Sequence, residues 1–394
     1  MTRITSLLLA LALLATNTLS ASEPVKLTPE EQQRWEQLAP GIPMTEALFE
    51  AMKAAVFDLP LTVEERIAAI ARMSGVEPTD GRPRLSRRIC IWDMLGREGP
   101  IFNAAMAQRE RVLKFGIDLQ MVPYTSETVI AEELKAGLCD AALMSGLRAR
   151  QFNKYSGTID AVGALPSQDH LKVILEAISH PSNAGKMVDE NFVVLGIFPA
   201  GTAYVFVNDR SITTLAKAAG KRVAVLESDR IQSHMISSIG AIPVPSDFVT
   251  APSRFNNGTI DILPAPLVAY RTLELYKGMS PDGGIVRVPL AQLTMQLIGR
   301  RDKFPNEIAQ LVRESAMENY DLVMSFIREE TRQVPDKWWI EVPPADHTEY
   351  ETMMQSARVA LREESYYDGE MLTLQRKVRC KFDPSRAECS MNVE

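Results

Sequence analysis

The sequence predicts an α/β protein of two lobes that face each other across a cleft, each lobe a mostly parallel sheet flanked by helices. Two observations carry this prediction. The same order of strands, helices and glycines occurs twice along the chain, and 394 residues are enough for two or more domains of roughly 100–200 residues each. Helical patterns before the first unit and after the second predict extra helices at both ends.

The first unit has a βαβαβ pattern. Its expected elements are strands at 89–92, 117–122 and 141–144 and helices at 101–115 and about 127–136. Gly116 and Gly137 end the two helices, and Asp140 leads into the third strand. In an open sheet of this kind, ligands bind beyond the carboxyl ends of the strands.

The second unit repeats this order. Its expected elements are strands at 222–226, 242–244 and 262–263, a helix at 230–239 and a weaker helix before the last strand. Gly240 ends the first helix, and the pair Gly258 and Asp261 corresponds to Gly137 and Asp140. A glycine after a helix is by itself a common stop signal, so the prediction depends on the shared order.

The N-terminus predicts export. Arg3, an apolar run at 7–15 and small residues up to Ala21 form the pattern of a secretory signal peptide. The alternative, a membrane anchor, needs about 20 apolar residues. The expected organisation is a signal peptide at 1–21, a helical extension at 22–85 with a capping box at Thr62–Glu65, lobe I at 86–200, lobe II at 201–295, and a return segment with bracing helices and a C-terminal cover at 296–394.

Export makes disulfides possible for the four cysteines. Cys380 and Cys389 enclose a short turn, and a local bond between them is the simplest pairing. Cys90 and Cys139 each begin an apolar run, so they could bond if the two runs are neighbouring parallel strands. No cysteine and histidine spacing fits a zinc site, and the four histidines are scattered, so we expect neither a metal nor another cofactor.

Charge and motifs exclude several classes of function. The formal net charge of −7 has the wrong sign for a general nucleic-acid binder. The chain lacks GxSxG, GxxxxGK[ST], HExxH and GxGxxG motifs, so we expect a protein that is not an enzyme. The enzyme alternative depends on His234, which follows Ser228 and has no triad partner at a recognisable spacing.

Candidate binding residues lie where predicted strands end at the cleft or where helices begin there. Arg148 and Arg150 could clamp an anionic group, or they could pair with Asp160 or a neighbouring acid. Trp92 could stack on a ligand or pack in the core. The full candidate set is Trp92, Asp93, Ser126, Glu127, Gly146, Arg148, Arg150, Tyr204, Asn208, Ser228 and Pro266.

Several stretches carry a family resemblance that covers about residues 86–330. Residues 220–225 (GKRVAV), 240–245 (GAIPVP) and 257–261 (NGTID) look like the second lobe of the solute-binding subunits of TRAP transporters. Residues 90–93 (CIWD) and 146–153 (GLRARQFN) resemble a narrower group of solute-binding proteins formerly labelled aminoglycoside-resistance efflux components. The resemblance implies a two-lobed fold like that of periplasmic binding proteins.

One position departs from the TRAP pattern. The resemblance implies an arginine that clamps the ligand's carboxylate in the strand after the Gly-Lys pair, but Ala224 occupies that position and Arg222 lies two residues earlier. Residues two apart share a face of a regular strand, so Arg222 would sit one pleat too deep. The sequence therefore does not predict that this chain binds the carboxylate substrate expected of the family.

Together these observations predict a periplasmic, monomeric solute-binding protein. It would capture a small polar or anionic molecule between its lobes by hinge closure and deliver it to membrane transporter subunits. A second hypothesis is an envelope scaffold that binds another protein through its extra helices. An enzyme on the same scaffold is the third.

Overall fold

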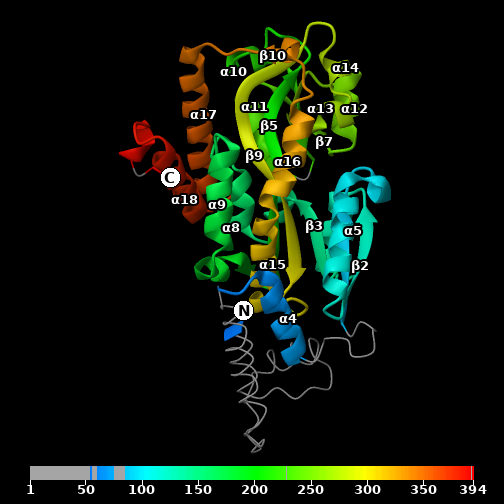
Figure 1. The fold of residues 1–394 in the computed structure, drawn as a ribbon. Coiled ribbons are helices and arrows are strands. Elements are labelled where there is room, and N and C mark those ends of the chain that lie inside the picture. The colour runs from blue at the N-terminus through cyan, green and yellow to red at the C-terminus, as the bar shows by residue number, and fades with distance from the viewer. Residues whose placement is uncertain (1–53, 56–59, 75–84, 228, 392) are drawn as a thin grey trace, which may run out of the picture.

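A computed structural model describes residues 54–55, 60–74, 85–227, 229–391 and 393–394. The predicted signal peptide and its cleavage site lie outside this part of the chain. The described strands form one mixed sheet in the order β2-β1-β3-β9-β5-β8-β6-β7, with β10 (Trp339–Ile340) beside β9 and β4 (Val188–Asp189) beside β5. The sheet runs through the whole molecule (Figure 1).

The first predicted unit is confirmed as three parallel strands with two helices. It contains β1 (Leu85–Trp92), β2 (Ile117–Tyr124), β3 (Ala141–Ser145), α5 (Pro100–Leu113) and α6 (Glu127–Lys135). β1 lies between β2 and β3 and pairs with both in parallel. Ile130 and Leu134 of α6 are fully buried against this sheet. We refer to this unit as lobe I.

The second predicted unit has the same topology. It contains β6 (Arg222–Leu226), β7 (Ile242–Ser246), β8 (Ile262–Pro266), α11 (Arg230–Ser238) and α12 (Thr250–Asn256). β6 lies between β7 and β8 and pairs with both in parallel. We refer to this unit as lobe II.

The repeated glycines and aspartates have the same physical role in both lobes. The glycines that end the helices adopt left-handed backbone angles, with φ of 76° at Gly137 and 75° at Gly258. Asp140 accepts a hydrogen bond from the Arg88 amide at 2.8 Å, and Asp261 accepts one from the Arg222 amide at 2.8 Å. Each aspartate therefore joins the end of its αβ connection to the start of the central strand.

Two long antiparallel strands, β5 (Phe192–Val207) and β9 (Gly284–Arg300), connect the lobes. β9 also pairs with β3 of lobe I, and β5 with β8 of lobe II. The expected boundaries at 200 and 295 fall inside these strands, so the chain changes lobe without leaving the sheet. The exact division into domains remains a prediction.

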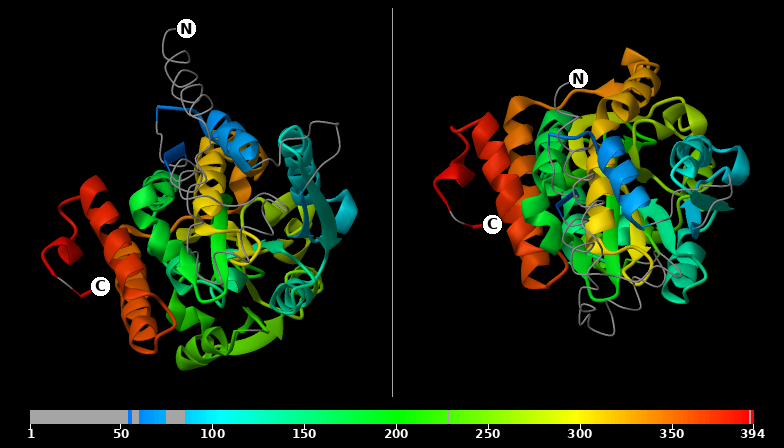
Figure 2. Two further views of the ribbon diagram at one scale, coloured as in Figure 1. Left: turned by 90° about the horizontal axis from the view of Figure 1, so that it is seen from below. Right: turned by 60° about the horizontal axis from the view of Figure 1, so that its bottom comes forward.

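Helices cover the faces and one side of this sheet. They include α4 (Val63–Ser74), α7 (Gly146–Ala149), α8 (Lys154–Gly157), α9 (Gln168–Ser179), α10 (Leu215–Ala218), α13 (Ala269–Thr272) and α14 (Tyr276–Met279). The capping box of α4 is confirmed, because Glu65 accepts from the Thr62 amide at 2.9 Å and donates its own amide to Thr62 Oγ1 at 3.2 Å. α4 packs beside α15 (Asn306–Glu318), as both views of Figure 2 show.

Two helices follow residue 305 in the return segment. α15 ends at Asn319, whose side-chain amide donates to the Ser315 carbonyl at 2.7 Å, and α16 (Tyr320–Thr331) follows. An asparagine side chain bonded to the backbone competes with helix continuation. The C-terminal cover also consists of two helices, α17 (Pro344–Glu363) and α18 (Gly369–Phe382), which are separated by a turn with Ser365 at a φ of 60°.

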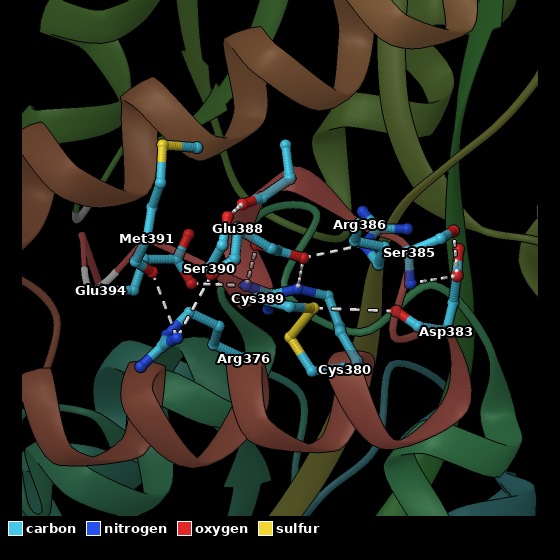
Figure 3. The surroundings of a disulfide bond; sticks show 12 residues. Arg376, Cys380, Asp383, Ser385, Arg386, Glu388, Cys389, Ser390, Met391 and Glu394 are labelled. Atoms are coloured by element: carbon cyan, nitrogen blue, oxygen red, sulfur yellow. Dashed lines mark hydrogen bonds and ion pairs between the residues drawn. A yellow bond between two sulfur atoms is a disulfide. The ribbon is translucent and has the colours of Figure 1, made fainter.

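A buried ion-pair network fixes the segment after α18. Arg379 is fully buried, binds both carboxylate oxygens of Glu388 at 2.7 Å, and contacts Glu394 at 2.5 Å. Arg358 of α17 donates to Glu394 at 2.8 Å. The disulfide Cys380–Cys389 closes the turn beside this network (Figure 3).

The C-terminal cover formed by α17 and α18 contacts both lobes. On the lobe I side, Arg379 donates to the Ala164 carbonyl at 2.7 Å. On the lobe II side, the Tyr366 hydroxyl donates to Asp229, the N-cap of α11, and Tyr350 donates to the Thr213 carbonyl at 2.6 Å. The cover thus holds the two lobes together along one side of the molecule (Figure 2).

Both expected cysteine pairings are present. Cys90–Cys139 joins β1 to the segment just before the neighbouring parallel strand β3 inside the core of lobe I, and Cys380–Cys389 closes the terminal turn. Within the described ranges no helix combines the length and the hydropathy needed to cross a membrane.

The ion-pair network predicts a large stability effect for Arg379→Leu. The substitution leaves the Glu388 and Glu394 carboxylates buried without their main partner, so we expect a loss of about 3–5 kcal/mol in the free energy of unfolding. The matched control Arg332→Leu removes an arginine that is 74% exposed and whose one ion pair among the described residues is with Glu329; it should cost less than about 1 kcal/mol. Urea unfolding followed by circular dichroism measures both, and equal midpoints would contradict the prediction.

The two disulfides should stabilise the protein unequally. The sequence separations are 49 and 9 residues, and in the chain-entropy model these loops correspond to about 4 and about 2.5 kcal/mol. We expect the double variant Cys90→Ala with Cys139→Ala to lose more stability in urea than Cys380→Ala with Cys389→Ala. The reverse order would show that loop entropy does not govern these bonds.

Candidate functional site

A cleft of about 220 Å³ lies between the lobes, at the carboxyl ends of β1 and β2 on one side and of β6 and β7 on the other. This is the edge where open parallel sheets bind ligands. Its volume suits a small solute, since pockets for drug-sized molecules span roughly 300–1,000 Å³. It is lined by Trp92, Thr125, Ser126, Glu127, Thr128, Arg148, Leu226, Glu227, Ser246, Asp247, Phe248, Val249 and Thr250.

The lobe I wall presents hydroxyl and guanidinium groups around the start of α6. Ser126 is the N-cap of this helix, and its Oγ accepts from the Val129 amide at 3.4 Å. Arg148 donates from Nη2 to the Thr128 hydroxyl at 3.1 Å and forms no ion pair in the described chain. The first amides of a helix have no intrahelical acceptor. This wall is therefore rich in hydrogen-bond donors.

Glu127 is the one carboxylate of the lobe I wall, and it is 5% exposed. It accepts from the Ser145 amide at 2.6 Å and from the Ser145 hydroxyl at 3.0 Å. Burial raises the pKa of Glu127 to about 7, although the bonds from Ser145 and the nearby Arg148 act in the opposite direction. A large fraction of this carboxyl is thus uncharged near neutral pH.

The lobe II wall carries two carboxylates. Asp247 Oδ1 accepts from the Val249 amide at 3.0 Å and from the Thr250 amide at 2.6 Å. Burial opposes its ionisation, but the bonds from Thr250 and Val249 hold the pKa of Asp247 below its usual range. Glu227 is exposed, and its carboxylate has no partner among the residues described.

An aromatic contact joins the two walls. The rings of Trp92 and Phe248 come from opposite lobes, with their centroids 5.3 Å apart and their planes tilted by 52°. Trp92 is 6% exposed and donates from Nε1 to the Thr125 carbonyl at 3.2 Å. Trp92 therefore packs in lobe I and also lines the cleft.

Four of the candidate residues, Trp92, Ser126, Glu127 and Arg148, come together at the cleft. Asp93 lies next to it but is 2% exposed and accepts from the amides of Leu95, Ile101 and Phe102 at 2.7–3.1 Å. Its carboxylate thus fixes the loop before α5. Ser228 lies outside the described residues.

Other candidates lie away from the cleft lining. Arg150 packs over the Tyr366 ring at 4.1 Å and lies 3.9 Å from Asp229, so its partners differ from the expected Asp160. Asp160 instead accepts from Thr294 at 2.6 Å. Gly146 packs against the side chain of Thr294. A Cβ added at Gly146 would lie 2.3 Å from the Thr294 hydroxyl oxygen.

Three lobe II candidates also lie elsewhere. Tyr204 packs edge-on against Trp339 at 5.2 Å, and Pro266 pairs with β5. Asn208 donates to Asp261 at 3.0 Å, at the amino end of β8. β5 is antiparallel to β8, so its carboxyl end lies at the opposite edge of the sheet from the cleft.

The segment 246–250 and Glu227 are functional candidates that the sequence reasoning did not select. The segment follows the second strand of lobe II, as Ser126 and Glu127 follow the second strand of lobe I. Comparing the two repeats element by element selects this segment, because it occupies the same place in lobe II as Ser126 and Glu127 do in lobe I.

Arg222 does not reach the cleft. It begins β6, at the end remote from the cleft, and binds Asp261 through two hydrogen bonds of 2.8 and 2.6 Å. Ala224 is buried within the strand. Neither residue supplies the carboxylate clamp of the TRAP pattern. Among the residues with described positions, no cluster of three or more metal-ligating side chains occurs.

Glu127 predicts a pH dependence of stability. Its pKa rises from an ordinary value of 4.5 to about 7 in the folded state, so between these values the folded state binds more protons than the unfolded chain. Stability therefore falls as the pH rises from about 4.5 to about 7, by at most about 1.4 kcal/mol per pH unit for one group. Asp160, whose pKa burial also raises to about 7, contributes with the same sign.

Replacing Glu127 with Gln keeps an acceptor for Ser145 and removes the titrating group. The free energy of unfolding should therefore fall less steeply with pH than it does in the unaltered chain. Urea midpoints measured from pH 4.5 to 7.5 test this, with Glu110→Gln on the exposed surface of α5 as the control. An unchanged slope in the Glu127 variant would contradict the assignment.

Solved structures with a similar fold include periplasmic solute-binding proteins of TRAP transporters. One from Ralstonia eutropha with bound (S)-2-acetolactate matches with a TM-score of 0.61 and 12% identity, over 75% of this chain and 99% of that one. One from Shewanella oneidensis with bound succinate matches with a TM-score of 0.59 and 12% identity, over 74% and 98% of the two chains. These likenesses show the two-lobed fold.

Sequence comparisons assign the chain to a particular family of solute-binding proteins. A protein of Acinetobacter baumannii named "Probable solute-binding protein AdeT1" is 40% identical over 304 residues, which cover 77% of this chain and 100% of that protein. "Probable solute-binding protein AdeT2" of the same organism is 26% identical over 236 residues, 60% of this chain and 99% of its own. The family model described as "Solute-binding protein AdeT 1/2" matches residues 89–394. The chain thus belongs to the AdeT 1/2 family of solute-binding proteins.

Proposed function

We propose that the protein captures a small polar or anionic solute in the interlobe cleft and delivers it to membrane transporter subunits from the periplasm. The observation that carries the proposal is the cleft itself, which is built from the strand ends of both lobes and bridged by Trp92 and Phe248. A ligand held there contacts both lobes at once, so its binding favours the closed arrangement.

Two further observations support this proposal. The fold neighbours from Ralstonia eutropha and Shewanella oneidensis hold small organic acids. The N-terminal pattern up to Ala21 predicts export, which would place a monomeric receptor where a transporter could meet it.

The family and fold point to binding rather than catalysis. The enzyme alternative depends on His234 of α11, and the described cleft lining contains neither histidine nor cysteine. The scaffold alternative depends on the extra helices and would not need the cleft.

A thermal-shift screen of the chain purified from the periplasm tests solute capture. The panel contains carboxylates, amino acids, sugars, polyamines and aminoglycosides. A ligand at 100 times its Kd adds about 2.7 kcal/mol to the stability of the folded state, so one chemical class should raise the Tm in a saturable way.

Arg148→Ala should weaken binding of that class at least about tenfold in calorimetry, because a lost charge-assisted hydrogen bond commonly costs about 1.5–3 kcal/mol. The control Arg332→Ala, at the exposed C-cap of α16, should bind the solute as tightly as the unaltered chain does. If no class shifts the Tm, the scaffold hypothesis replaces solute capture.

A further inference from the structure

The two walls of the cleft carry charge of opposite sign. On the lobe I wall, Arg148 is the cation, and the hydroxyls of Ser126 and Thr128 add donors. The carboxyl of Glu127 is buried, and each of its oxygens already accepts a hydrogen bond from Ser145 within lobe I. An anionic group of a ligand therefore finds its partners on lobe I.

The lobe II wall is the acceptor side. Glu227 is exposed with its carboxylate unpaired in the described chain. Asp247 uses Oδ1 for the amides of Val249 and Thr250, while Oδ2 forms no hydrogen bond or ion pair within the ranges described. The lining residues of this wall include no cation.

Arg254 contacts the lobe II wall but does not line the cleft, so it adds no positive charge to the cleft lining. Its Nη1 donates to the Pro245 carbonyl at 2.8 Å and to the Ser246 hydroxyl at 2.9 Å. Its side chain is therefore engaged behind the segment 246–250, outside the set of residues that lines the cleft.

The aromatic pair adds a second feature that suits a cation. Trp92 and Phe248 meet at 5.3 Å in the cleft lining, and aromatic faces attract ammonium groups through their quadrupoles. Carboxylates beside aromatic rings form a common setting for a bound amine, whereas a simple carboxylate would meet two negative charges on the same wall.

We infer that the cleft selects a small zwitterion, whose anionic group binds Arg148 on lobe I while its ammonium group binds Glu227 and Asp247 beside Phe248 on lobe II. This inference rests on the proposed function of solute capture and names the chemical class of the solute.

Isothermal titration calorimetry with matched probes tests the inference. The probes are glycine, 3-aminopropanoate, 4-aminobutanoate and 5-aminopentanoate, each compared with the carboxylate and the primary amine of the same carbon chain. We expect at least one zwitterion to bind ten times or more tighter than both of its counterparts. Glu227→Gln should weaken the binding of that zwitterion at least fivefold and leave the affinity for the matched carboxylate unchanged or higher. The control Glu110→Gln should change neither affinity.

Several outcomes overturn the inference while solute capture stands. These are a carboxylate or an amine that binds as tightly as its zwitterion, a zwitterion whose affinity does not respond to Glu227→Gln, or binding only to an uncharged member of the thermal-shift panel. If neither these probes nor the panel bind, solute capture itself fails. Because Glu227 is exposed, the variant should keep its Tm without ligand, which a melting curve checks.

Discussion

The hydrogen-bonded pair of long strands β5 and β9 is the constraint on which the rest of the structure depends. These strands pair from Phe192 with Arg300 to Val207 with Gly284, so both lobes share one continuous ladder. β3 attaches to one end through β9, and β8 attaches to the other through β5. Because the parallel strands of both lobes are fixed to this pair, their carboxyl ends meet at a single cleft. Three register shifts lie in the middle of the ladder, where bulges bend and twist strands.

The C-terminal cover adds a second connection between the lobes. Figure 1 shows α17 and α18 on the side of the molecule away from β2 and α12. On the cover side, Arg150, Asp229 and Tyr366 form a buried contact that joins lobe I, lobe II and the cover. At the cleft, the aromatic contact of Trp92 with Phe248 joins the lobes. The lobes are therefore joined at two places, at the cover by a polar contact and at the cleft by an aromatic one.

The cleft combines an architecture shared with the TRAP solute-binding proteins and charged residues that differ from the TRAP pattern. The fold is that of TRAP solute-binding proteins, but Arg222 is committed to Asp261 and Ala224 stands at the position of the expected clamp. Arg148 is the cation that lines the cleft, and Glu227 and Asp247 face it from the other lobe. The charges that would recognise a solute therefore come from the short helix α7 after β3 and from the loops after β6 and β7, while the strands hold these segments in place.

The sequence predicts the order of elements in both lobes, the two disulfide pairings and four of the cleft residues. It does so because helix-ending glycines, the aspartates before the last strand of each unit and apolar runs are local signals. The roles of Tyr204, Asn208 and Arg150 do not follow from it. A local pattern shows that Asn208 ends a strand, but only the antiparallel pairing of β5 with β8 places that end at the edge remote from the cleft. The tertiary structure likewise brings Phe248 to Trp92 and Asp229 to Arg150, since each contact joins segments of different lobes. Sequence thus determined the repeating units, and packing between them decided which strand ends face each other.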